Sequence, residues 1–171
     1  MSKQTEMTPR EAILAVLGAV PDQRIEGKKR LQKLIQLLQF SGAPIQASYS
    51  IHHYGPYSSS IADAAEELCL FEEIKCEEKP CGNNGMWQSV YSLEPANKKT
   101  SFFSDRHQEI LKKLNGYSTV ELEVASTVAL FLREGLSKEE AVKETEDLKP
   151  TRAIPQVLKK ADEILGLCSA A

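Results

Sequence analysis

Two stretches of this 171-residue chain combine side chains that can bind a ligand or take part in a reaction. One is a hexapeptide rich in histidine and tyrosine, and the other is a basic segment that precedes it. The hexapeptide consists of His52, His53, Tyr54, Gly55, Pro56 and Tyr57, and the basic segment contains Lys28, Lys29, Arg30 and Lys33. Imidazoles transfer protons, tyrosine rings stack, and amino groups attract anions. We take Lys29, Arg30, Lys33 and residues 52–57 as the candidate binding residues.

The surrounding motifs do not favour catalysis by these residues. His52 and His53 are neighbours, and neighbouring side chains on a strand point to opposite faces, so at most one would face a given pocket. The chain has no G-x-S-x-G nucleophile motif, no Walker A motif and no dinucleotide fingerprint. We therefore predict no catalytic residue, no enzyme activity and no cofactor. An enzyme with His52 or His53 in a pocket is a third hypothesis, and a purely structural role for the hexapeptide is also open.

The four cysteines offer a metal site only through an unusual arrangement. They are Cys69, Cys76, Cys81 and Cys168. A metal site would combine Cys76 and Cys81 with Cys69, His52 or His53, but the chain has no C-x-x-C pair. We expect no metal, four reduced cysteines, and Cys69 as a small core residue.

Length and charge limit the classes of protein to which the chain can belong. Its 171 residues suffice for one domain or two small lobes. A net charge of −3 gives it no overall attraction to nucleic acid or anionic membrane. The absence of a long apolar run and of a signal-peptide pattern predicts a cytoplasmic protein that does not associate with membranes.

The elements that must position the candidate residues can be read from periodicity and caps. Thr8, Pro9 and Glu11 predict the start of a first helix, which Pro21 ends. Residues 24–27 are expected to be a connector. A second helix over 28–40 has an apolar face and an opposite polar face. The apolar face comprises Leu31, Leu34, Ile35, Leu37 and Leu38, and the polar face comprises Lys29, Gln32, Lys33 and Gln36.

After this helix the residues 47–54 favour a strand, and Gly55-Pro56 predicts a turn. Ser58, Ser59 and Ser60 are alternative caps for a third helix, whose buried side presents Ile61, Ala64, Ala65 and Leu68. Strands are expected over 71–78 and 86–93, joined by a loop. Three helices followed by a β-hairpin is the order of a winged helix.

The rest of the chain is expected to be helical. Helices are predicted over 104–114 and 120–133, after the capping box at Ser137 with Glu140, and after Thr151. A capping box of Ser118 with Glu121 precedes helix 120–133, which we expect to be the central helix of its lobe. The predicted fold is α+β and mostly α, with a winged-helix-like lobe over 1–95 packed on an all-helical lobe over 96–171.

The distribution of charge argues against the usual DNA-binding mode of a winged helix. The third helix and following strand carry seven acidic residues against Lys75: Asp63, Glu66, Glu67, Glu72, Glu73, Glu77 and Glu78. Phosphates would repel such a surface. The basic face over 28–33 is the alternative DNA-binding surface, although a solvated helix face is the commoner role for such residues.

Two sequence features carry a resemblance to known proteins. The segment 29–35, K-R-L-Q-K-L-I, followed by Y-G-P-Y-S at 54–58, resembles small uncharacterised prokaryotic proteins of the YwgA type over most of the chain. Residues 14–68 also show a more distant similarity to the Panacea (SocA-like) antitoxin domain. The first resemblance implies a prokaryotic cytosolic protein without an established reaction, and the second implies binding to a toxin or a protease.

Together these observations predict a protein–protein interaction or regulatory module that lacks catalytic activity. Its partner would be another protein or a second copy of the chain. The alternative is a winged-helix transcriptional regulator that binds DNA through the Lys28 to Lys33 face.

Overall fold

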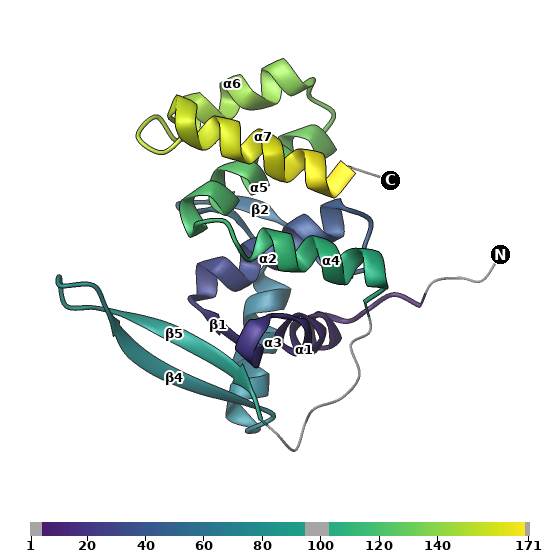
Figure 1. The fold of residues 1–171 in the computed structure, drawn as a ribbon, viewed down its shortest axis with the longest axis vertical. Helices are drawn as coiled ribbons and strands as arrows, with labels where there is room; N and C mark the ends of the chain where they lie inside the picture. The colour runs from purple at the N-terminus through teal and green to yellow at the C-terminus, as the bar shows by residue number, and fades with distance from the viewer. Residues whose placement is uncertain (1–4, 95–102, 170–171) are drawn as a thin grey trace.

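The computed structural model describes residues 5–94 and 103–169, and within them the chain is α+β and mostly helical (Figure 1). The helices are α1 (Pro9–Ala19), α2 (Lys28–Phe40), α3 (Ser59–Leu70), α4 (Asp105–Leu114), α5 (Thr119–Arg133), α6 (Lys138–Leu148) and α7 (Pro155–Ser169), with a 3₁₀ turn η1 (Pro21–Gln23). The strands are β1 (Arg24–Glu26), β2 (Ser50–His52), β3 (Gly55–Tyr57), β4 (Ile74–Cys81) and β5 (Met86–Leu93). The predicted lobe boundary at 95/96 lies outside the described residues.

Local capping sets most helix starts where the sequence predicts them. Capping boxes begin α1 at Thr8, α5 at Ser118 and α6 at Ser137, and Ser58 is the serine that caps α3. In each case the cap oxygen accepts a hydrogen bond from a first-turn N–H that would otherwise lack a partner. The last helix differs from the prediction, because α7 begins at Pro155 instead of directly after Thr151. Proline suits a first helical position, where no N–H is needed.

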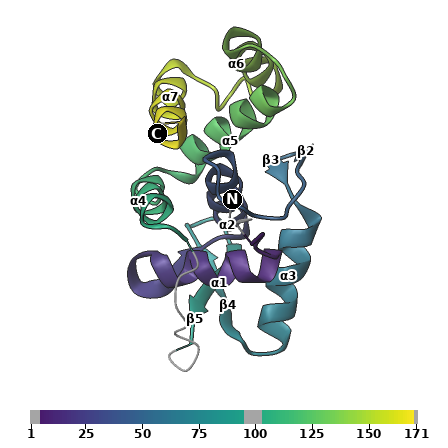
Figure 2. The ribbon, with the colours of Figure 1, turned by 90° about the vertical axis from the view of Figure 1, so that its right-hand side faces the viewer.

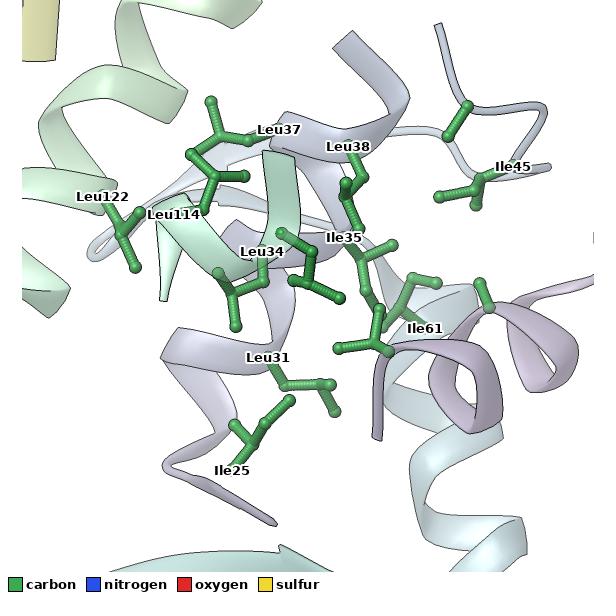
Figure 3. Close-up of a cluster of buried hydrophobic side chains, with 14 of the residues drawn as sticks. Ile25, Leu31, Leu34, Ile35, Leu37, Leu38, Ile45, Ile61, Leu114 and Leu122 are labelled. Atoms are coloured by element: carbon green, nitrogen blue, oxygen red, sulfur yellow. The ribbon is translucent and has the colours of Figure 1, made fainter. Parts of the chain in front are cut away.

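Helix α2 is the centre of the molecule. It contacts α1, α3, α4, α5 and α7, and its predicted apolar face is buried (Figure 3). Its predicted outer polar face is also buried, since Gln32, Lys33 and Gln36 are nearly inaccessible. The prediction of a solvated face is therefore wrong for these three residues. The reason is tertiary: α5 packs on that side, and Gln36 donates a hydrogen bond to the carbonyl of Ser126.

Helix α5 is the second core element, as predicted. It contacts α2, α6, α7 and strand β3, so the C-terminal helices pack around it. Figure 2 shows α5 between α2 and the pair formed by α6 and α7. The buried residues of α5 run from Leu122 to Leu130 and include Glu123, a charged residue in a stretch that otherwise has no charge.

A three-stranded antiparallel sheet with the order β1-β5-β4 flanks the N-terminal helices. The predicted connector at 24–27 instead forms β1, which pairs Ile25 with Tyr91 of β5. Strand β5 spans the predicted 86–93, whereas β4 begins at Ile74 and not at residue 71 because Phe71 still caps α3. The β4–β5 hairpin projects from the body (Figure 1), and Met86 and Trp87 near its tip are exposed.

A second, two-stranded sheet carries the hexapeptide. His52 pairs with Gly55, so His53 and Tyr54 form the turn, and Gly55-Pro56 lies in strand β3. The predicted turn at Gly55-Pro56 is therefore wrong, and the predicted strand over 47–54 shortens to β2. Proline is tolerated here because a two-stranded sheet leaves one side of each strand free of ladder hydrogen bonds.

Two of the four cysteines form a disulfide, which corrects the prediction that all are reduced. Cys69 near the end of α3 is bonded to Cys76 of β4, with their Cα atoms 5.7 Å apart. The tight turn between α3 and β4 brings the two residues together. Cys81 is exposed and Cys168 is buried. Burial raises the pKa of the Cys168 thiol to about 12.

In the parts of the chain that the structure describes, no helix combines the length and the apolar character needed to cross a membrane.

Candidate binding site

A cavity of about 430 Å³ lies between α2, α3 and the β2–β3 hairpin. Seven of the nine predicted site residues line it: Lys29, Lys33, His52, His53, Tyr54, Gly55 and Tyr57. The other lining residues are Lys28, Leu31, Gln32, Ile61, Ala62, Ala65, Glu66 and Tyr91. The sequence-predicted residues therefore meet at one place, and only Arg30 and Pro56 lie outside the lining.

Both histidines line this cavity, which contradicts the prediction that at most one can face a given pocket. The prediction assumed that both lie on a strand, but His53 occupies the hairpin turn, where the alternation of a strand does not apply. The ring of His52 lies against that of Tyr57, with the ring centroids 4.6 Å apart.

Lys33 reaches across from α2 to the hairpin. Its side chain is 2% exposed, and its Nζ donates a hydrogen bond of 2.6 Å to the carbonyl of Pro56. Among the described residues, no carboxylate oxygen lies within ion-pair distance of this ammonium group. The pKa of Lys33 is lowered from 10.5 to about 8, mainly by burial. The carboxylate of Glu123 acts in the opposite direction, and the neighbouring cations Lys149 and Lys29 add smaller lowering effects.

Gln32 fastens the other end of strand β3. Its Nε2 donates to the carbonyl of Ser58 at 2.9 Å, and its Oε1 accepts from the backbone N–H of Ser58 at 3.0 Å. This reciprocal pair fixes the residue that caps α3, so α2 positions both the hairpin and the start of α3. The buried polar residues of α2 therefore build the walls of the cavity.

A buried ionic cluster joins α5 to the connection between α6 and α7 and contacts the turn of the β2–β3 hairpin. Glu123 is 1% exposed and forms ion pairs with Lys149, at 2.5 Å, and with Arg152. Lys149 also donates to the carbonyl of His53 at 3.3 Å. Our sequence analysis did not identify this cluster. The signal was present, because Glu123 stands between Leu122 and Val124 in a helix predicted to be central, and a charge buried at such a position needs a partner.

Tyr54 at the tip of the hairpin is 47% exposed, and its ring is in contact with two cations. Lys29 Nζ is 3.1 Å from the centroid of its ring, and the guanidinium carbon of Arg152 is 5.7 Å from it. Cations over an aromatic face are attracted by the ring quadrupole. The four cations Lys29, Lys33, Lys149 and Arg152 surround one carboxylate, Glu123, so this region carries an excess of positive charge.

Arg30 lies apart from the other candidate residues. Its guanidinium donates to the carbonyls of Asn115, at 2.6 Å, and Tyr117, at 2.9 Å, in the connection between α4 and α5. It therefore joins α2 to the connection between α4 and α5 and is not among the residues that line the cavity.

The described residues contain no group of three or more histidine, cysteine or acidic side chains placed to hold a metal ion. The alternative site of Cys76 with Cys81 and Cys69 or a histidine is not formed, because Cys69 and Cys76 are bonded to each other.

The chain matches no protein-family model, but it is similar to a curated bacterial protein. The chain is 33% identical over 123 residues to the uncharacterized protein YwgA of Bacillus subtilis (strain 168). The match covers 68% of this chain and 70% of that relative. The more distant similarity to the Panacea antitoxin domain stays a prediction.

Proposed function

The chain belongs to the family of the uncharacterised Bacillus subtilis protein YwgA, and on that premise we propose that it is an interaction or regulatory module and not an enzyme. The observation that carries the proposal is the surface around the β2–β3 hairpin. This hairpin surface consists of Lys29, His53, Tyr54, Leu148 and Arg152. It combines an exposed aromatic ring and an exposed leucine with cationic side chains.

The composition of the hairpin surface resembles that of a protein interface. Tyrosine and arginine are enriched among residues that dominate binding energy. Leu148 and His53 line one shallow depression with Lys149. Tyr54 offers an apolar ring whose position is held by Lys29 and Arg152, so little conformational entropy is lost on binding. We infer that the partner contributes an acidic segment, because the cations here outnumber Glu123.

Photo-crosslinking tests this proposal in cells of the source organism. A benzophenone amino acid placed at Tyr54 should capture one partner protein or a second copy of the chain. The same group at Lys143, which is exposed on α6, should not. Capture should disappear when Lys29→Glu reverses a charge at the surface and persist with Lys113→Glu. Equal capture from positions 54 and 143, or capture that is indifferent to Lys29→Glu, would contradict the proposal.

DNA binding is the second candidate function, favoured by the order of the elements. Helices α1, α2 and α3 followed by the β4–β5 hairpin follow the sequence of a winged helix. Of the basic face over 28–33, Lys28 and Lys29 are exposed, whereas Lys33 is buried and Arg30 is bound to backbone carbonyls. The exposed side of α3 is acidic, with Asp63, Glu66 and Glu67.

Light scattering of the purified protein, alone and with duplex DNA at low and moderate salt, separates the two candidates. A complex that dissociates as salt rises, and that Lys28→Glu with Lys29→Glu abolishes, would favour DNA binding. A stable assembly that is indifferent to DNA would favour the interaction module. Because Lys33 is buried, its substitution is not a test of phosphate contacts.

A further inference from the structure

The ammonium group of Lys33 is a buried charge whose hydrogen-bonding capacity is only partly used. It has three N–H donors, and within the described residues one of them is used, toward the carbonyl of Pro56. A buried charge is costly unless it is paired and hydrogen-bonded. The protein nevertheless places this group on the wall of a cavity instead of extending it to solvent.

The carboxylate that acts on Lys33, Glu123, already forms ion pairs with other cations. Its Oε1 accepts from Lys149 and its Oε2 from Arg152, so both oxygens are used by other cations. Glu123 favours the charged form of Lys33 through space, but its pull is smaller than the effect of burial. The positive charge of Lys33 therefore has no ion-pair partner among the described residues, and a bound anion could supply one.

Part of the cavity lining is apolar. Leu31 and Ile61 are fully or almost fully buried, and Ala62 and Ala65 of α3 leave space because their side chains end at Cβ. Lys28 and Lys29 are exposed and line the same cavity together with one exposed carboxylate, Glu66. The cations on the lining outnumber this carboxylate, so an approaching anion is attracted toward the cavity. A volume of about 430 Å³ is in the range of small-molecule sites.

We propose that this cavity binds a small organic anion, with its anionic head on Lys33 and its apolar body against Leu31, Ile61 and Ala65. Carboxylates and phosphate monoesters share the head-group chemistry that an ammonium group recognises. The inference concerns the interior of the cavity and does not depend on the protein partner proposed for the hairpin surface.

Anion binding at this position should be coupled to proton uptake. At pH 8 the free protein should hold Lys33 about half protonated, since its pKa there is about 8. An anion beside the ammonium group stabilises the protonated form and raises that pKa. About half a proton should therefore be taken up for each anion bound at pH 8, and almost none at pH 6.

The test uses the full chain with phenylacetate and phenyl phosphate as probes and neutral phenylacetamide as the matched control. Amide NMR shifts on titration should report a Kd on the order of 1 mM or tighter for at least one anion and about tenfold weaker binding of the amide. The shifts should localise to residues 28–33, 52–57 and 61–66. Which anion binds more tightly identifies carboxylate or phosphate as the preferred head group.

Proton uptake is measured by calorimetry of the tighter anion in two buffers of different ionisation enthalpy at pH 8. Lys33→Met keeps the apolar stem and should lose the proton uptake together with about tenfold in affinity. Lys143→Met, on the exposed side of α6, should change neither. Ala62→Leu keeps Lys33 but narrows the cavity, and it should weaken binding even if Lys33→Met does not fold.

The inference is overturned if neither anion binds at about 10 mM, which is weaker than simple fragment binding. It is also overturned if phenylacetamide binds as tightly as phenylacetate, if the shifts localise elsewhere, or if Lys33→Met and Ala62→Leu both retain full affinity.

Discussion

The ammonium group of Lys33 and the carbonyl oxygen of Pro56 lie 2.6 Å apart, so a charge buried on α2 holds the strand that carries half of the hexapeptide. The contact joins residues 23 positions apart in sequence. It explains how a basic motif and an aromatic motif, each recognisable by itself, become one site. It also sets the first of four predictions.

We expect stability to depend on pH through Lys33. Its pKa is about 8 in the folded protein, and its ordinary value of 10.5 applies in the unfolded chain. Between pH 8 and 10.5 the unfolded chain therefore binds more protons than the native one. The free energy of unfolding of the wild type should therefore rise between pH 8 and 10.5, by up to about 3 kcal/mol relative to Lys33→Met. Below pH 8 the difference should be constant. Urea titrations at several pH values measure it, and parallel pH profiles would refute it.

Glu123→Gln should destabilise the protein by about 3 kcal/mol or more, because it leaves the buried Lys149 without its ion-pair partner. Chemical denaturation measures this loss. Glu144→Gln, on the exposed side of α6, is the matched control and should change stability by less than about 0.5 kcal/mol. Adding Lys149→Met to Glu123→Gln should cost less than the sum of the two single changes, since the pair acts as a unit. Strictly additive losses would show that the two groups are not coupled.

Two glycines should respond to alanine in opposite directions. Gly55 has φ +92°, and a Cβ there would lie 3.1 Å from Thr127 Oγ1 and 3.2 Å from Glu123 Cγ. Gly55→Ala should therefore cost about 1–3 kcal/mol. Gly166 lies inside α7 with open space around its Cβ position, so Gly166→Ala should stabilise by about 0.5–1 kcal/mol. Melting temperatures of the two variants give the comparison, and equal shifts would argue against the packing of the hairpin on α5.

The disulfide between Cys69 and Cys76 predicts a defined thiol count. The oxidised protein should show two thiols when unfolded, from Cys81 and Cys168, and four after reduction. In the native state only Cys81 should react rapidly, because Cys168 is buried and its pKa is raised to about 12. Cysteines seven positions apart close a short loop, so replacing both by serine should cost about 2–3 kcal/mol. Four reactive thiols in the untreated unfolded chain would exclude the bond.

Local sequence rules predicted the helices well because their signals are local. Caps at Thr8, Ser118 and Ser137 act within one helical turn, and the apolar period of residues 28–40 predicted both the bounds and the buried face of α2. Strand β5 was predicted at its bounds for the same reason, since alternation and turn residues are properties of neighbouring positions. The resemblance to the YwgA family was also carried by contiguous motifs and is confirmed.

The errors with the largest consequences concern contacts between distant segments. The residues 24–26 became a strand only because β5 offers a partner, and Gly55-Pro56 left its expected turn because Lys33 and α5 hold it extended. The chemistry of Cys69 depends on the path of the chain between α3 and β4.

The sequence by itself determined the helical framework, the candidate residues and the family, because periodicity, caps and motifs are encoded within short stretches of chain. Tertiary structure alone decided that α2 is buried on both faces. That change turns Lys33 from a solvated charge into a buried ammonium group on a cavity wall and directs Arg30 to the carbonyls of Asn115 and Tyr117. The physical reason is that burial and charge pairing depend on which distant surface covers a residue, and no local pattern specifies the covering helix.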